Sequence, residues 1–159
     1  MTVKIRPMVA EDKPAVMKIL KETPEFKPAE VVVAEEVIDS YLKDPLGSGY
    51  YVMVADDDAE TAGYTCYGPT PLTEGTWDLY WLAVASSNQG HGIGTSLMRM
   101  AEKAIEEGGG RLIMVETSST PGYERARRLY CGLGYEIIAR FPDFYTPGDD
   151  KVVFQKRLA

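Results

Sequence analysis

The sequence predicts one mixed α/β domain over residues 1–159, with a central mixed, mostly antiparallel sheet of about seven strands flanked by about four helices. Short apolar runs of strand length are interspersed with longer stretches whose apolar residues recur at helical spacing. Glycine and proline mark most of the boundaries, and no repeat, linker or low-complexity run divides the chain. With 45% hydrophobic and 26% charged residues, the composition suits one folded domain with its own core.

The first half of the chain predicts three strands and two helices. A polar turn at 56–59 joins two of the strands into a hairpin. The apolar stripe of the second helix consists of Val33, Val37, Ile38, Tyr41 and Leu42. In order, the predicted elements are a strand at 2–6, a helix that begins near Asp12 and closes at Pro24, a loop at 23–28, the second helix ending before Pro45, and strands at 50–55 and 60–67.

The second half predicts a strand, a glycine-rich loop and an amphipathic helix, followed by further strands and one more helix. On the amphipathic helix Glu102 falls among the charged residues opposite the apolar stripe of Leu97, Met98, Ala101, Ala104 and Ile105. The strands on either side of this helix are expected to pair in parallel through a right-handed crossover. In order, the predicted elements are a strand at 78–85, the helix up to a stop at 108–110, a strand at 111–117, a helix after Pro121 that Gly134 ends, and strands at 135–141 and 151–156 around a turn-rich loop at 142–150.

The glycine-rich loop predicts a phosphate-binding turn. Gly90, Gly92 and Gly94 stand at alternate positions between a strand and a helix, where bare backbone amides and the helix dipole attract an anion. The spacing is not that of a Rossmann fingerprint, and Thr95 stands where a Walker loop requires a lysine. Dinucleotide binding and P-loop chemistry are therefore disfavoured.

Two motifs resemble those of the GCN5-related N-acetyltransferases. Gln89, Gly92 and Gly94 fill the fixed positions of the family's pyrophosphate-binding signature, in the strand-to-helix setting that the family requires. A second motif of the family, near its C-terminal end, is matched by Tyr130, Gly134 and Tyr135, although Leu129 replaces its first aromatic residue. The predicted order of elements is also similar to that of the family over essentially the whole chain.

The resemblance implies a ligand and an activity. The ligand is acetyl-coenzyme A, and the reaction is direct transfer of its acetyl group to a primary amine of a small molecule or a peptide, without a covalent cysteine intermediate. In the family the central strand bulges and separates from its neighbour, and a backbone amide near Leu82–Val84 faces the thioester oxygen. The residues expected to contact the coenzyme are Leu82, Ala83, Val84, Gln89, Gly90, His91, Gly92, Ile93, Gly94 and Thr95.

The resemblance also indicates catalytic residues. Tyr130 corresponds to the family's general acid, although its helical position also suits a core aromatic. Glu116 is the candidate general base, because it lies near the C-terminal end of a strand, where ligands bind in such sheets, but it would also suit a surface ion pair. Asp78, Tyr80 and Tyr145 are expected to line the acceptor site, with ordinary sheet packing as the alternative.

Composition limits the remaining functions. A net charge of −7 disfavours a nucleic-acid partner, and two cysteines provide neither a disulfide framework nor a metal site. No signal peptide or membrane-spanning stretch is recognised, so a cytoplasmic protein without a membrane partner is expected. The sequence leaves two alternatives open: the protein could form a homodimer, and it could be a non-catalytic acyl-coenzyme A sensor instead of an enzyme.

Overall fold

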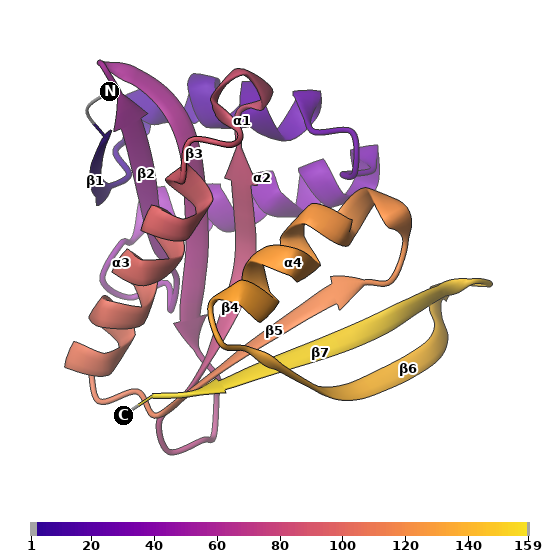
Figure 1. Ribbon diagram of the computed structural model, residues 1–159. Helices are drawn as coiled ribbons and strands as arrows, with labels where there is room; N and C mark the ends of the chain where they lie inside the picture. The colour runs from indigo at the N-terminus through magenta and orange to yellow at the C-terminus, as the bar shows by residue number, and fades with distance from the viewer. Residues whose placement is uncertain (1–2, 159) are drawn as a thin grey trace.

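The computed structural model describes residues 3–158, which form a seven-stranded sheet with helices on both faces (Figure 1). The strands are β1 (Val3–Pro7), β2 (Tyr51–Asp57), β3 (Glu60–Pro69), β4 (Thr76–Val84), β5 (Leu112–Ser118), β6 (Glu136–Thr146) and β7 (Asp149–Arg157). The α-helices are α1 (Lys13–Glu22), α2 (Pro28–Lys43), α3 (Ile93–Glu107) and α4 (Glu124–Gly132). Short 3-10 turns η1 (Ala10–Asp12), η2 (Ser86–Asn88) and η3 (Pro121–Tyr123) precede α1, the glycine loop and α4. The predicted fold class is confirmed.

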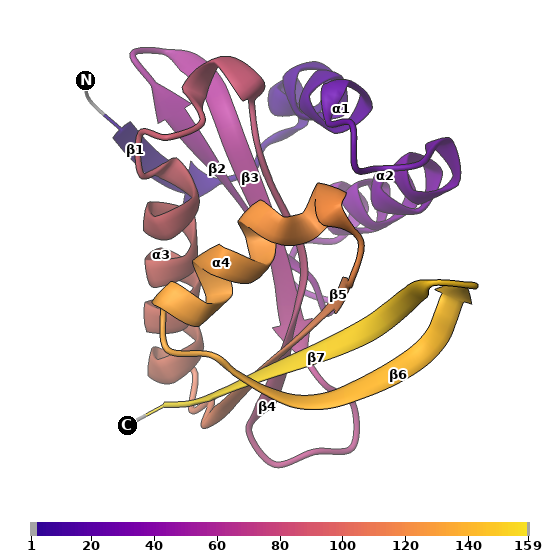
Figure 2. The ribbon, with the colours of Figure 1, turned by 45° about the vertical axis from the view of Figure 1, so that its right-hand side comes forward.

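The strand order is β1-β2-β3-β4-β5-β7-β6, and only the central pair, β4 and β5, is parallel. This parallel pair follows from the crossover through α3, as the sequence predicts. The hairpin of β2 and β3 turns at Asp58 and Ala59, both with positive φ, which matches the right-handed twist of the strands. The β6–β7 hairpin forms the other end of the sheet and runs beneath α4 in both views (Figures 1 and 2).

The two faces of the sheet carry separate apolar clusters. Helices α1 and α2 cover one face, where Leu20 and Ile38 pack with Val54 and Tyr64 of the strands. Helices α3 and α4 cover the other face, where Met98 and Tyr130 are buried with Phe154 (Figure 2). β4 contributes to both clusters, Leu79 to the second and Ala83 to the first, because a register shift between Leu79 and Trp81 moves its odd-numbered side chains from one face of the sheet to the other.

Three sequence predictions need correction. Helix α2 begins at Pro28, a favourable first position, and its buried face uses Val31 and Ala34 while Val33 is exposed. Glu102 is buried on α3, because Lys156 at 3.1 Å and the Tyr135 hydroxyl at 2.9 Å satisfy its carboxylate. These partners come from β7 and from the residue that precedes β6, which helical periodicity does not register.

The third correction concerns the predicted loop at 142–150, which is mostly strand. β6 continues to Thr146 and pairs there with Asp149, so only a short turn separates the two strands. Between Phe141 and Thr146 the ladder is irregular, and Asp143 has positive φ. The turn-forming residues thus mark a bulge within a hairpin rather than a loop.

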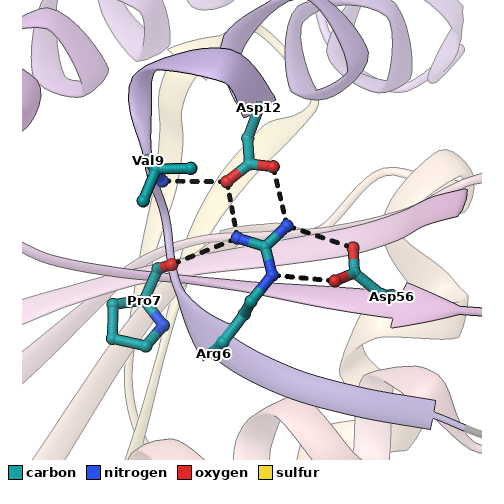
Figure 3. Close-up of polar contacts among 5 residues, drawn as sticks. All are labelled: Arg6, Pro7, Val9, Asp12 and Asp56. Carbon is teal, nitrogen blue, oxygen red and sulfur yellow. Dashed lines mark hydrogen bonds and ion pairs between the residues drawn. The ribbon is translucent and has the colours of Figure 1, made fainter. Parts of the chain in front are cut away.

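An ion network fixes the start of the chain to the sheet (Figure 3). The Arg6 guanidinium, on β1, donates to both carboxylate oxygens of Asp12 at 2.8 Å and to Asp56 of β2 at 2.8 Å. Asp12 also accepts the Val9 backbone amide at 2.8 Å. The network therefore links β1, β2 and the turn before α1.

Candidate active site

The sheet opens between β4 and β5. Their parallel pairing ends at Leu79 opposite Val115, and just beyond it Tyr80 is an extra residue of β4 relative to β3, which makes a β-bulge. From there the two strands run apart toward their C-terminal ends (Figure 1). The bulge and separation that the family resemblance implies are both present.

The predicted segment Leu82–Val84 lies on this open stretch of β4. On one side it pairs with β3, where Leu82 is opposite Thr65. On the other side the described sheet offers it no strand partner, so backbone groups on that side are free to bind a ligand. Leu82 lines the adjoining cavity, whereas the Ala83 side chain is buried in the core beneath.

The glycine loop follows β4 directly. Gly90 and Gly92 have φ of 83° and 77°, and a β-carbon at either would meet nothing within 4 Å. These glycines are therefore required by backbone conformation rather than by crowding. Gln89 faces back toward the strand and donates its side-chain amide to the Val84 carbonyl at 3.3 Å, which positions the loop. His91 is exposed.

Helix α3 begins with Gly92 as its N-cap, which provides no side-chain acceptor. The amides of Ile93, Gly94 and Thr95 thus have no partner within the helix, and the helix dipole adds positive potential there. A β-carbon at Gly94 would lie 3.4 Å from Leu129 of α4, so this glycine allows the two helices to approach. The loop and the helix start fit a pyrophosphate on geometric grounds.

A cavity of about 690 Å³ lies at the opening of the sheet and is lined by β4, β5, α4 and the start of α2. Tyr130 lines it although the residue is only 5% exposed, and its ring packs 5.5 Å from Phe154 and 6.0 Å from Tyr135. Its hydroxyl bonds to no other part of residues 3–158, yet is not among the oxygens sealed from solvent. The hydroxyl therefore opens into the cavity.

Burial raises the pKa of Tyr130 well above its ordinary value. The phenol consequently stays protonated throughout the neutral and mildly alkaline range. It therefore carries a proton that it can donate to a departing thiolate, and it is not a base near neutral pH.

Glu116, near the end of β5, also lines the cavity. Its side chain is 56% exposed and pairs with Lys151 of β7 at 2.8 Å. Lys151 in turn lies over the ring of Phe144, 4.6 Å from its centre. The structure thus brings Glu116 and Tyr130 to one cavity. It also shows the ion pair of Glu116 with Lys151, which the sequence offered as the alternative to a catalytic role.

The three expected acceptor residues line the same cavity. Asp78 accepts the Thr70 hydroxyl at 2.7 Å. Tyr80 stacks edge-on against Tyr50, and burial, followed by the charge of Asp78, raises its pKa to about 12. Tyr145 lies on β6 rather than in a loop, and its ring is edge-on to Phe144 at 5.1 Å.

Four further cavity residues were missed by sequence reasoning. The Tyr123 hydroxyl donates to Glu30 at 3.0 Å, which joins η3 to α2. Also in the cavity lining, the Ser118 hydroxyl donates to Asp149. Only Glu30 could have been found from the local sequence, because it stands at the third position of a helix that begins with Pro28, where its carboxylate accepts the Lys27 amide in a capping box. Ser118 and Asp149 meet through pairing of β5 with β7, and Tyr123 reaches α2 from η3, contacts that no motif encodes.

Two negative observations apply to residues 3–158. No group of three or more His, Cys, Asp or Glu side chains is arranged to hold a metal ion. None of the helices in this range has both the length and the apolar composition needed to cross a membrane.

Sequence and structure comparisons agree with this geometry. The Acetyltransferase (GNAT) family matches residues 14–135. A crystal structure of a GNAT-family protein from Desulfovibrio desulfuricans is 39% identical, with a TM-score of 0.94 over 99% of this chain and 100% of the other. No curated protein matches the sequence.

More distant structures share the fold. The ribosomal-protein-S18-alanine N-acetyltransferase of Escherichia coli has a TM-score of 0.78 at 17% identity, covering 99% of this chain and 95% of the other. An aminoglycoside 6'-N-acetyltransferase, solved with coenzyme A, has a TM-score of 0.76 at 21% identity, covering 97% and 96%.

The separation of β4 from β5, the glycine loop that follows β4 and the Tyr130 hydroxyl in the adjoining cavity are together typical of an acyltransferase. The chain belongs to the acetyltransferase (GNAT) family.

Proposed function

We propose that the protein is an acetyl-coenzyme A dependent N-acetyltransferase that acts on a primary amine of a small molecule or peptide, with residues 1–159 as its one domain. The observation that carries the proposal is the opening of β4 from β5 beside a cavity into which the buried Tyr130 hydroxyl points. Acetyl-coenzyme A supplies the activated acetyl thioester.

The loop from Gln89 to Thr95 holds the pyrophosphate in this proposal. Its left-handed glycines turn the chain so that backbone amides face outward, and the start of α3 adds unpaired donors. The open side of β4 near Leu82 then orients the pantetheine arm and offers a backbone amide to the thioester oxygen. Both roles use main-chain atoms, which explains why few side chains are specified.

Tyr130 acts as the general acid, because its raised pKa keeps the proton that the leaving sulfur requires. Glu116 acts as the general base for the incoming amine, directly or through water. Its ion pair with Lys151 positions the carboxylate at the cavity rim. Asp78, Tyr80 and Tyr145 form the acceptor wall, and a cytoplasmic location with a second copy as partner completes the proposal.

The test is thiol release from acetyl-coenzyme A over a panel of primary amines and peptides. We expect amine-dependent release for at least one acceptor and N-acetylated product by mass spectrometry. Coenzyme binding measured by calorimetry, with no turnover for any acceptor, would instead support a non-catalytic acyl-coenzyme A sensor. No binding at all would reject both functions.

A further inference from the structure

The cavity is more acidic than the transfer reaction itself requires. Its lining contains a single lysine, Lys27, and five carboxylates, namely Glu25, Glu30, Asp78, Glu116 and Asp149. Lys151 neutralises Glu116 at 2.8 Å. Across residues 3–158, neither Glu30 nor Asp149 has a lysine, arginine or histidine nitrogen within 4 Å. Glu25 and Asp78 have no ion-pair partner in this range either, so four of the five cavity carboxylates lack a countercharge, and among them only Glu30 and Asp149 act on both Tyr123 and Tyr145.

Both carboxylates are held in place by neutral donors. Glu30 accepts the Tyr123 hydroxyl with one oxygen, at 3.0 Å, and the Lys27 backbone amide with the other, at 3.2 Å. Asp149 is only 8% exposed, and one of its oxygens accepts the Ser118 hydroxyl. Its second oxygen has no partner among residues 3–158 and is not sealed from solvent, so it opens into the cavity.

The two carboxylates act on the same part of the cavity. Burial raises the pKa of Tyr145, and the charges of Glu116, Asp149 and Glu30 raise it further, so this phenol lies in the field of all three. Tyr123 likewise lies in the field of Glu30 and Asp149. Carboxylates from α2 and β7 thus converge beside aromatic rings, a combination that attracts an ammonium group by charge and by cation–π contact.

The reacting amine cannot provide the missing charge at the moment of transfer. Nucleophilic attack requires a neutral nitrogen, and the neighbouring Glu116 is already balanced by Lys151. The buried, unpaired hydroxyl of Tyr130 in the same cavity independently indicates that a polar ligand completes the site. A second, permanently protonated amine on the acceptor would satisfy the two free carboxylates.

We propose that the acceptor is a diamine or polyamine, and that Glu30 and Asp149 bind the ammonium group that does not react. This assignment rests on the proposed acetyltransferase function and adds the chemical class of its acceptor. Glu30 and Asp149 are specificity-determining residues here, not proton carriers.

The test compares diaminobutane with aminobutane, which has the same carbon chain but one amine. We expect the wild-type protein to have a kcat/KM about tenfold or more higher for the diamine, mainly through a lower KM. In Asp149→Asn and Glu30→Gln, which keep the shape of the side chain and remove its charge, the ratio between the two substrates should fall toward one. Glu106→Gln, an exposed carboxylate of α3 outside the cavity, should leave the ratio unchanged.

Equal kcat/KM for diaminobutane and aminobutane in the wild-type protein would overturn the diamine proposal and leave the acetyltransferase function intact. Loss of activity on both substrates alike in the two variants would also overturn it. If no amine is acetylated, calorimetry decides separately: diaminobutane binding that Asp149→Asn weakens supports the ammonium site, and absence of binding rejects it. Thermal unfolding of each variant confirms that it is folded.

Discussion

At the scale of single residues, Tyr130 combines a buried ring with a hydroxyl that has no protein partner among residues 3–158. The sequence left two interpretations, core aromatic and general acid, and the structure shows that they are compatible. The ring packs with Phe154 and Tyr135, while the oxygen reaches the cavity. Packing of the ring thus fixes the position of the acid, and the same burial raises its pKa.

Replacing Tyr130 with phenylalanine should separate these two contributions. We expect kcat to fall about a hundredfold, because the proton donor is removed while the ring still packs. Coenzyme affinity in calorimetry and the free energy of unfolding should change little. An unchanged kcat under conditions where chemistry limits the rate would remove Tyr130 from the mechanism.

Tyr135→Phe is the matched control. Its hydroxyl donates to the buried Glu102 at 2.9 Å and does not line the cavity. This variant should lose about 1 to 3 kcal/mol of unfolding free energy, since a buried carboxylate loses a donor, and keep its kcat.

At the scale of elements, the glycine loop depends on main-chain conformation. Gly92 caps α3 in the left-handed region, where a side chain is strained even in open space. The opposite end of the same helix offers a comparison, because Gly109 has φ of 84° and is equally open.

Gly92→Val should reduce coenzyme A affinity by about tenfold or more, because it moves the amides that face the pyrophosphate. Gly109→Val carries similar backbone strain of about 1 to 2 kcal/mol but should leave the affinity unchanged. Calorimetric titration of coenzyme A into both folded variants is the measurement. Equal affinities would reject the assignment of the loop.

The network of Arg6, Asp12 and Asp56 is a second feature at this scale (Figure 3). The hydrogen bond from Arg6 lowers the pKa of Asp12, against the opposing effect of burial. A carboxyl whose pKa is lower folded than unfolded stabilises the fold above its unfolded pKa. That stabilisation is lost as the pH falls through the folded pKa.

Asp12→Asn should therefore lower the free energy of unfolding at neutral pH by about 2 kcal/mol, and its difference from wild type should shrink in acid. Urea unfolding at a series of pH values measures this. Glu124→Gln, which breaks an exposed pair with Arg128, should have nearly no effect at any pH. If the free energy of unfolding of Asp12→Asn stayed below that of wild type in acid, the effect would come from packing and not from the charge of Asp12.

At the scale of the whole molecule, the site lies where the two apolar clusters meet. β4 contributes Ala83 to the cluster under α1 and α2, and Leu79 to the cluster under α3 and α4. The bulge at Tyr80 separates these two residues and begins the opening from β5. A ligand in the opening would contact both halves of the fold.

Coenzyme A should consequently stabilise the entire domain. At about one hundred times its dissociation constant we expect the unfolding free energy to rise by about 2.7 kcal/mol and Tm by roughly 5 to 10 °C, in a single transition. A thermal scan with and without coenzyme A measures the shift. The Gly92→Val variant should show a much smaller one, and two separate transitions would contradict cooperative unfolding.

The sequence alone determined the local features of this protein. Periodicity and glycine or proline boundaries placed all four helices and the core of each strand, and the alternate glycines with Gln89 predicted a phosphate-binding loop. These features depend on residues close together in the chain. The family resemblance added Tyr130 and the coenzyme, and both expected acid and base line one cavity.

Only the tertiary structure decided which distant residues meet. Periodicity placed Glu102 in solvent, but partners from β7 and from the residue that precedes β6 allow its burial, and turn residues at 142–150 concealed a continuing strand. Glu30 and Asp149 are more than a hundred residues apart and reach one cavity because strand order brings α2, β5 and β7 together. Strand pairing is a non-local choice, so the donor site could be inferred from the chain whereas the acceptor site required the fold.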